Sequence, residues 1–116
     1  MIPRLFTALT IVALAGCAGD PVPGEQMRLT EQAVAQARGL GADDSSEALQ
    51  LALAKFAIAQ KNMAEEDYKR ARVLAEQAEL DARLAEAQVL RNNSEAQLRS
   101  MNAAIERLRQ RLGEQQ

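Results

Sequence analysis

The segment DYKRARVLAEQAELDARLAEA (Asp67–Ala87) decides the fold, because alanine recurs in it with a regular spacing. The steps between these alanines alternate between four and three residues, which places them along one face of a helix. Small residues at a helix contact allow a short interaxial distance. The pattern therefore predicts a tightly packed helical hairpin. We call this set the alanine stripe: Ala71, Ala75, Ala78, Ala82 and Ala85.

The partner for this face is predicted in the preceding segment, over residues 45–63. There, small and large apolar residues share a compatible spacing: Ala48, Ala52 and Ala59 beside Leu49, Leu53, Phe56 and Met63. A shorter first helix is predicted over residues 26–38. Gly39 and Gly41 end it, and Asp44 with Glu47 has the form of a capping box for the second helix.

A third helix is predicted over residues 66–112. No glycine or proline marks a turn before it, but KNMAEED (Lys61–Asp67) combines the weak helix former Asn62 with acidic residues that suit a helix start. At 1.5 Å per residue this helix is about 70 Å long. A second helix of about 19 residues covers it only to about Ala85, so we expect its C-terminal part to protrude.

A second, apolar stripe runs along the third helix. Its members again alternate by four and three residues, as in a heptad repeat: Leu80, Leu84, Ala87, Arg91, Ser94, Leu98, Met101, Ile105, Leu108 and Leu112. We call these ten residues the outer stripe, and Leu98, Met101, Ile105, Leu108 and Leu112 the seam. The seam predicts a helix–helix interaction with a second copy or with another protein. The polar run Arg91–Ser94 either fixes register, bends the helix, or delays the start of the coil.

Composition excludes several classes of protein. The 116 residues suffice for one small domain, and the fold class expected is all-α. Histidine is absent, there is one cysteine, and no metal-ligand cluster or phosphate-binding loop is visible, so we expect no enzyme, cofactor or metal site. A net charge of −2 does not favour nucleic-acid binding. Arg107, Arg109 and Arg111 either contact acidic envelope polymers or complement the end of the helix.

The N-terminus has the pattern of a targeting signal. Arg4 precedes an apolar run, Leu5–Ala15, that is too short for a membrane span of roughly 20 residues. Cys17 lacks both a histidine to activate it and a second cysteine to pair with. We therefore expect residues 1–16 to be a signal peptide, residues 17–25 to form an extended tether, and residues 26–116 to form the helical domain.

Leu14-Ala15-Gly16-Cys17 resembles the lipobox of bacterial lipoproteins. The resemblance implies cleavage before Cys17, diacylglycerol on its sulfur and an acyl chain such as palmitate on the new N-terminus. Ala18, rather than aspartate, follows the cysteine. By resemblance to sorted lipoproteins, this favours the outer membrane, with the protein on the periplasmic face.

Residues of about 27–90 resemble the alanine-rich lipoproteins of the domain-of-unknown-function family DUF4398. The stretches that carry the resemblance are AVAQARGLGA (Ala33–Ala42), ALQLALAKFAIAQ (Ala48–Gln60) and the segment Asp67–Ala87. The family implies an all-helical, tetratricopeptide-like hairpin on a Gram-negative envelope lipoprotein, without a known activity. Its members often have glycine at the second turn, where this chain has Glu65-Glu66.

These expectations favour an outer-membrane-anchored helical adaptor or spacer that acts through helix–helix contacts. In this arrangement the third helix points away from the membrane. One alternative is a Braun-type trimeric coil bound to peptidoglycan without a covalent link, since the last lysine of the chain is Lys69. Another alternative is a small chaperone-like holdase.

Overall fold

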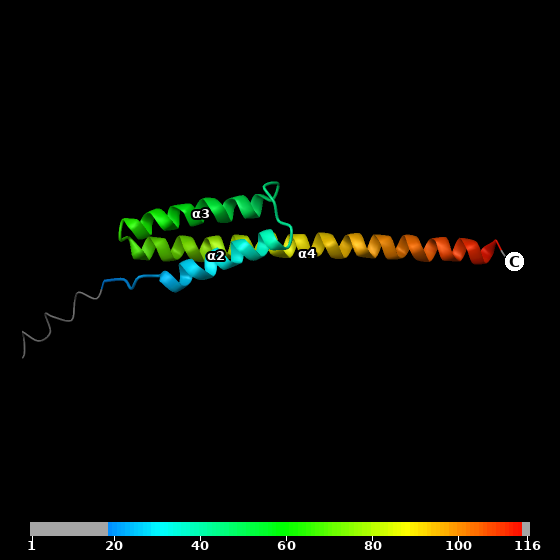
Figure 1. The fold of residues 1–116 in the computed structure, drawn as a ribbon, viewed down its shortest axis with the longest axis horizontal. Coiled ribbons are helices and arrows are strands. Elements are labelled where there is room, and N and C mark those ends of the chain that lie inside the picture. Colours follow the sequence, from blue (N-terminus) through cyan, green and yellow to red (C-terminus); the bar gives the residue numbers. More distant parts are fainter. Residues whose placement is uncertain (1–18, 115–116) are drawn as a thin grey trace, which may run out of the picture.

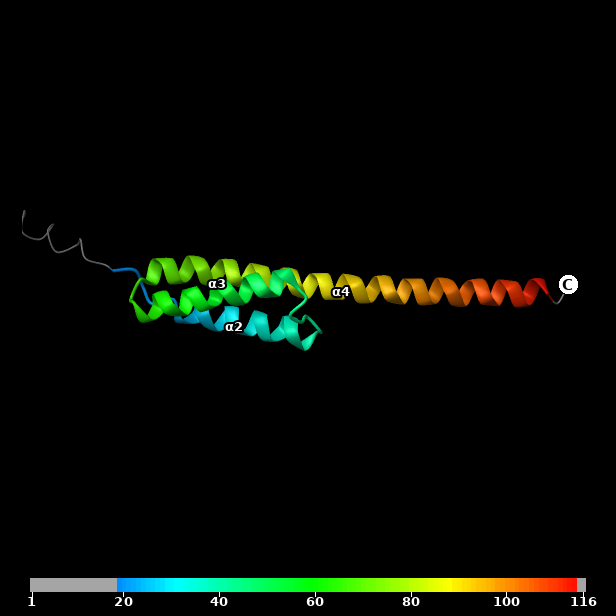
Figure 2. The same ribbon diagram turned by 90° about the horizontal axis from the view of Figure 1, so that it is seen from above.

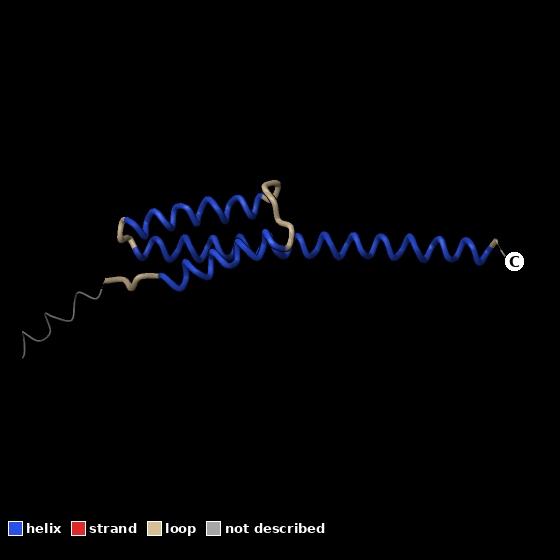
Figure 3. The backbone as a smooth tube through the Cα atoms, in the orientation of Figure 1, coloured by secondary structure: helices blue, strands red, loops and turns tan. Residues whose placement is uncertain are grey.

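The computed structural model describes residues 19–114, which form three α-helices and no strand (Figure 1, Figure 3). The helices are α2 (Gly24–Gly39), α3 (Glu47–Ala64) and α4 (Tyr68–Gly113). Each end lies within two residues of the bound expected from the sequence. The long C-terminal helix is therefore confirmed: α4 contains 46 residues and is about 69 Å long.

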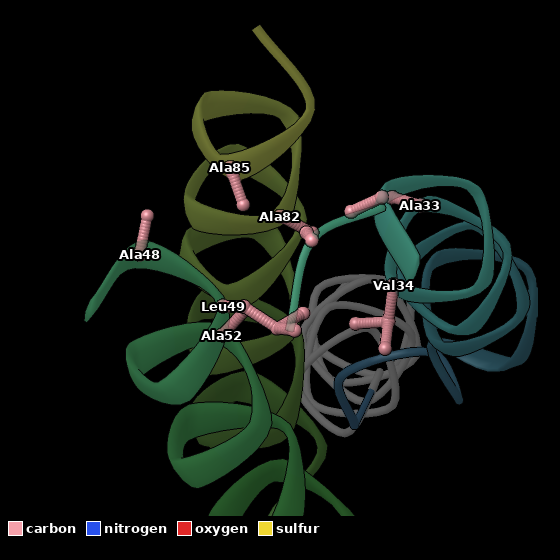
Figure 4. Packing of buried hydrophobic residues seen from close by; sticks show 9 residues of the cluster. Ala33, Val34, Ala48, Leu49, Ala52, Ala82 and Ala85 are labelled. Carbon is pink, nitrogen blue, oxygen red and sulfur yellow. The ribbon is translucent and has the colours of Figure 1, made fainter. Parts of the chain in front are cut away.

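The alanine stripe forms the centre of the core, because α2 and α3 both pack against α4. All five alanines of the stripe are fully buried. Ala82 and Ala85 of the stripe share one core cluster with small residues of α3 and with Leu49, the largest fully buried apolar side chain (Figure 4). The same cluster includes Ala33, Val34 and Ala37 of α2. The predicted close hairpin is confirmed, and α2 completes a three-helix body on the same face of α4.

Polar contacts fix α2 against α4. The fully buried Thr30 hydroxyl lies 2.9 Å from the Ala75 carbonyl oxygen of α4 and 2.9 Å from the Gln26 carbonyl oxygen of its own helix. Gln26 Nε2 donates to Glu79 Oε2 at 2.7 Å. This hydrogen bond, together with Arg83, holds the pKa of the Glu79 carboxyl below its usual value, against the opposing effect of burial. The carboxylate form is thus favoured between the two helices.

One ion pair joins α3 to α4. Lys55 Nζ lies 2.7 Å from Asp81 Oδ2, and both side chains are partly buried. On α4, Asp81 directly precedes the buried Ala82 of the stripe. The ion pair adds a directional contact to a hairpin whose other packing contacts are made by small apolar side chains.

The start of α3 differs from the sequence-based expectation. Asp44 does not cap it; instead the Ser46 side chain accepts a hydrogen bond from Leu49 N at 3.3 Å. Upstream, the Asp43 carboxylate accepts from the backbone N–H of Ser45 at 2.9 Å, which holds residues 43–45 in a turn. The helix can therefore begin only at Glu47, two residues after the predicted start.

The two turns between helices use the same backbone geometry with different residues. After α2, Gly41 N donates to Arg38 O and Ala42 N to Ala37 O; after α3, Glu66 N donates to Met63 O and Asp67 N to Asn62 O. Both are Schellman motifs, which place one residue at positive φ. That residue is Gly41 (φ 111°) in the first turn and Glu66 (φ 61°) in the second.

The reversal predicted near residues 63–66 is thus present, but its acidic residues have unequal roles. Asp67 caps α4, because its side chain accepts from Arg70 N at 3.2 Å. Glu65 and Glu66, expected to suit the helix start, instead close α3. Glu66 occupies the position where the resemblance to DUF4398 implies glycine.

We predict that Ala78→Leu destabilises the body by about 1–3 kcal/mol, because a leucine at this fully buried position forces α2 and α3 away from α4. Thermal unfolding followed by circular dichroism measures the effect, with Ala103→Leu as a matched control on an exposed part of α4. Equal melting temperatures for the two variants would show that the close approach does not hold the body together.

We predict that Glu66→Gly stabilises the protein by about 0.5–1 kcal/mol. The left-handed conformation costs a non-glycine residue about 1–2 kcal/mol, and the added freedom of glycine in the unfolded chain offsets part of the gain. Glu65→Gly is the control, since Glu65 has φ −87° and gains nothing from glycine. Denaturant unfolding of both variants is the measurement; a Glu66→Gly midpoint at or below that of the unmodified protein would contradict the strain.

Candidate interaction surface

Helix α4 extends well beyond the three-helix body. Val89 is the last α4 residue that packs against the core, and every residue from 90 to 114 is exposed. Beyond Asn92, which lines a surface groove with Gly41 and Ala42, about 20 residues of helix project for about 30 Å (Figure 2). The seam lies on this projecting segment.

The two stripes of α4 lie on nearly opposite faces. Each residue of an α-helix turns by about 100°, and the outer stripe follows the register of the alanine stripe with an offset of two residues. The outer stripe is therefore rotated by about 200° from the face that α2 and α3 cover. A helix can dock along it without displacing the body.

The structure places all five seam residues in solvent. Their exposed fractions are 59% for Leu98, 60% for Met101, 45% for Ile105, 56% for Leu108 and 66% for Leu112. Nearer the body, Leu80 and Leu84 of the same stripe are 67% and 51% exposed. Within residues 19–114, no other segment of the chain covers this face. Exposed leucines in register are typical of a surface that another helix covers.

The polar run in the outer stripe does not break the helix. Residues 91–94 are helical, and α4 continues through them (Figure 3). The Ser94 hydroxyl donates to the Leu90 carbonyl oxygen at 2.9 Å, and Arg91 Nε lies 3.7 Å from Glu95 Oε1. These side chains are satisfied within α4 itself. The run thus divides an apolar stripe without ending the element that carries it.

Charged residues border the seam on the exposed helix. Glu95 Oε2 lies 4.0 Å from Arg99 Nη1, and Arg109 Nη1 lies 3.8 Å from Glu106 Oε2. More than half of each of these four side chains is exposed. Such loose surface pairs contribute about 0–1 kcal/mol each, so these side chains are free to pair elsewhere.

Sequence reasoning missed two exposed apolar residues on α3. Leu51 is 45% and Ile58 is 50% exposed, and Ile58 lines a surface groove with Leu74 of α4. Their spacing of seven residues is a signal that could have found them. They belong to the body, away from the projecting part of α4.

The described residues hold no group of three or more metal-ligating side chains, and none of their helices is sufficiently long and apolar to cross a bilayer. Cys17 and the signal segment 1–16 lie outside the described residues. The described chain starts with the coil Gly19–Pro23, at the end of the body where α3 turns into α4 (Figure 1). Arg72 donates to the Pro21 carbonyl oxygen at 3.2 Å, which holds this coil against α4.

Comparison with known protein families identifies the family of this chain. A family model, the domain of unknown function DUF4398, matches residues 25–101. The chain belongs to the DUF4398 family. The match spans the whole body and the first part of the projecting helix, and it ends at Met101 of the seam. No curated protein matches the chain.

The structure is also similar to a solved member of DUF4398. The crystal structure of a DUF4398 family protein from Pseudomonas aeruginosa PAO1 superposes with a TM-score of 0.80 at 55% sequence identity. The alignment covers 83% of this chain and 100% of that chain. This agreement supports the all-helical architecture with its long C-terminal helix.

Proposed function

We propose that this DUF4398 protein is a non-enzymatic helical adaptor or spacer, anchored by lipid to the periplasmic face of the outer membrane. The observation that carries the proposal is the projecting part of α4, which holds five exposed apolar residues in register beyond the body. A helix of this kind contributes little to the stability of its own chain. Its apolar face is stabilised only when a partner removes it from water.

The anchor is supported by the sequence around Cys17. The lipobox-like Leu14–Cys17 follows a short apolar segment. Several acyl chains, each CH₂ worth about 0.8 kcal/mol when buried, would hold the protein on a bilayer. The body would then stand close to the membrane, because only residues 18–23 separate Cys17 from α2.

We predict that Cys17→Ser abolishes incorporation of labelled palmitate and releases the protein from the membrane fraction, because the acceptor sulfur is lost. Ala18→Asp is the matched control: it should keep the label but move the protein to the inner membrane. Labelling and density-gradient fractionation measure both variants. Labelled Cys17→Ser protein in the outer membrane would overturn the anchor.

The helix–helix contact is tested by a photo-crosslinking amino acid at position 98 of the full chain in cells. Adducts at multiples of the protein's own mass would support a spacer, and an adduct with a different protein would support an adaptor. The same probe at Ala103, on the outward side of α4, should give weaker adducts. Absence of any adduct from position 98 would contradict a contact at the seam.

A further inference from the structure

The charged residues around the seam indicate which kind of helix binds it. We infer that the seam binds a second copy of this chain in an antiparallel coiled coil centred near residue 103. This inference specifies the helix–helix contact of the proposed function and rests on it. It follows from three observations: the heptad positions of the flanking charges, the place of Arg91, and the length of the projecting helix.

In this register, most a and d positions of the seam face an apolar residue of the second copy. In an antiparallel pair, each a position meets a d position of the other helix; in α4 the a positions include Leu98, Ile105 and Leu112, and the d positions include Ser94, Met101 and Leu108. Centring the pair near residue 103 places Leu98 against Leu108 of the second copy, and Met101 against Ile105. Leu112 meets Ser94, whose hydroxyl already donates within its own helix.

The same register pairs opposite charges. Residues at the e positions of antiparallel helices face one another, and in α4 these are Glu95, Asn102 and Arg109. Glu95 of each copy then faces Arg109 of the other, and Asn102 faces its own counterpart. Both charged side chains are more than half exposed and only loosely paired within their own helix. Antiparallel registers shifted by one heptad or two toward the bodies place Arg91 in an apolar layer. A shift of one heptad the other way leaves Leu98 outside the apolar layers and sets Asn102, rather than Glu95, opposite Arg109.

A parallel pair is disfavoured by Arg91. This residue occupies an a position, so two parallel helices in register bring its guanidinium group against that of the second copy. In a parallel pair Glu95 faces Leu90 and Arg109 faces Ala104, so neither charge finds an opposite partner. In the antiparallel register the layer of Arg91 falls beyond Gly113, where α4 ends. Arg91 then remains in solvent, paired with Glu95 of its own chain.

The overlap matches the free length of the helix. Residues 94–112 of the two copies cover one another for about 27 Å, and both bodies lie outside this zone. The start of α4 in one copy is then about 105 Å from the start in the other. Because the coil Gly19–Pro23 lies at that end of each body, the two anchor points are at opposite ends of a rod (Figure 1). Such a dimer lies along the membrane, so α4 would not point away from it as the sequence-based arrangement expects.

The register is tested by crosslinking full-length chains in cells. Ser94→Cys and Leu112→Cys variants carry different tags and are produced together, and a short bismaleimide reagent joins nearby thiols. We expect a mixed dimer that contains both tags, and no dimer when either variant is produced alone, since like positions are about 27 Å apart. The chain without an added cysteine measures the background from Cys17.

Charge reversal tests the flanking pairs. Glu95→Arg or Arg109→Glu should lower the yield of mixed dimer about tenfold, because two attractive contacts become repulsive, and the double variant should restore it. Arg107→Glu makes the same change in charge as Arg109→Glu at a position away from the seam, where the side chain donates to the Ala103 carbonyl oxygen of its own helix, and should leave the yield unchanged. Circular dichroism of each variant confirms that the helix remains folded.

Other results would overturn the inference. Dimers of each variant with itself, without a mixed dimer, would show a parallel coil. No dimer in any combination would show that the seam does not bind a second copy. Adducts from position 98 with a different protein would then still support the proposed function, whereas the absence of every adduct would refute both.

Discussion

The close approach of three helices along the alanine stripe is the contact on which the rest of the structure depends. Five fully buried alanines let α2 and α3 lie against one face of α4. Since side chains this small bury little apolar area each, the body relies on many short-range contacts and on a few directional ones, such as the Thr30 hydroxyl and the Lys55–Asp81 pair. The body ends at the turn between α2 and α3, and α4 continues alone beyond it.

This arrangement gives α4 two faces with different roles. The face of the alanine stripe builds the body, and the outer stripe, about 200° around the helix, remains in solvent. Small side chains on one face of α4 build the fold, and leucines on the other face are the surface that the proposed function assigns to association. In the antiparallel pair that we infer, the flanking charges Glu95 and Arg109 restrict the direction of the partner helix.

The sequence was sufficient to predict the features that rest on a repeated spacing, because such a spacing shows which residues share one face of a helix. The alanine stripe predicted the hairpin, and the expected helix lengths predicted that α4 extends beyond α2 and α3. Features made by single contacts escaped it: Thr30 bridging to Ala75, Ser46 rather than Asp44 at the start of α3, and the unequal roles of Glu65, Glu66 and Asp67. These depend on where backbone groups lie after folding, which residue patterns do not encode. Whether the seam binds a partner is likewise a property of two molecules.

Hydrogen exchange of the full chain in detergent, measured over a range of protein concentrations, tests the central division of α4 most directly. Amides of residues 71–89 should be protected at every concentration, because the body protects them. Amides of residues 94–112 should exchange rapidly when dilute and gain protection as concentration rises, because only a partner stabilises that segment. Protection of residues 94–112 that is strong and independent of concentration would contradict the account, since it would mean that α4 is stabilised within a single chain.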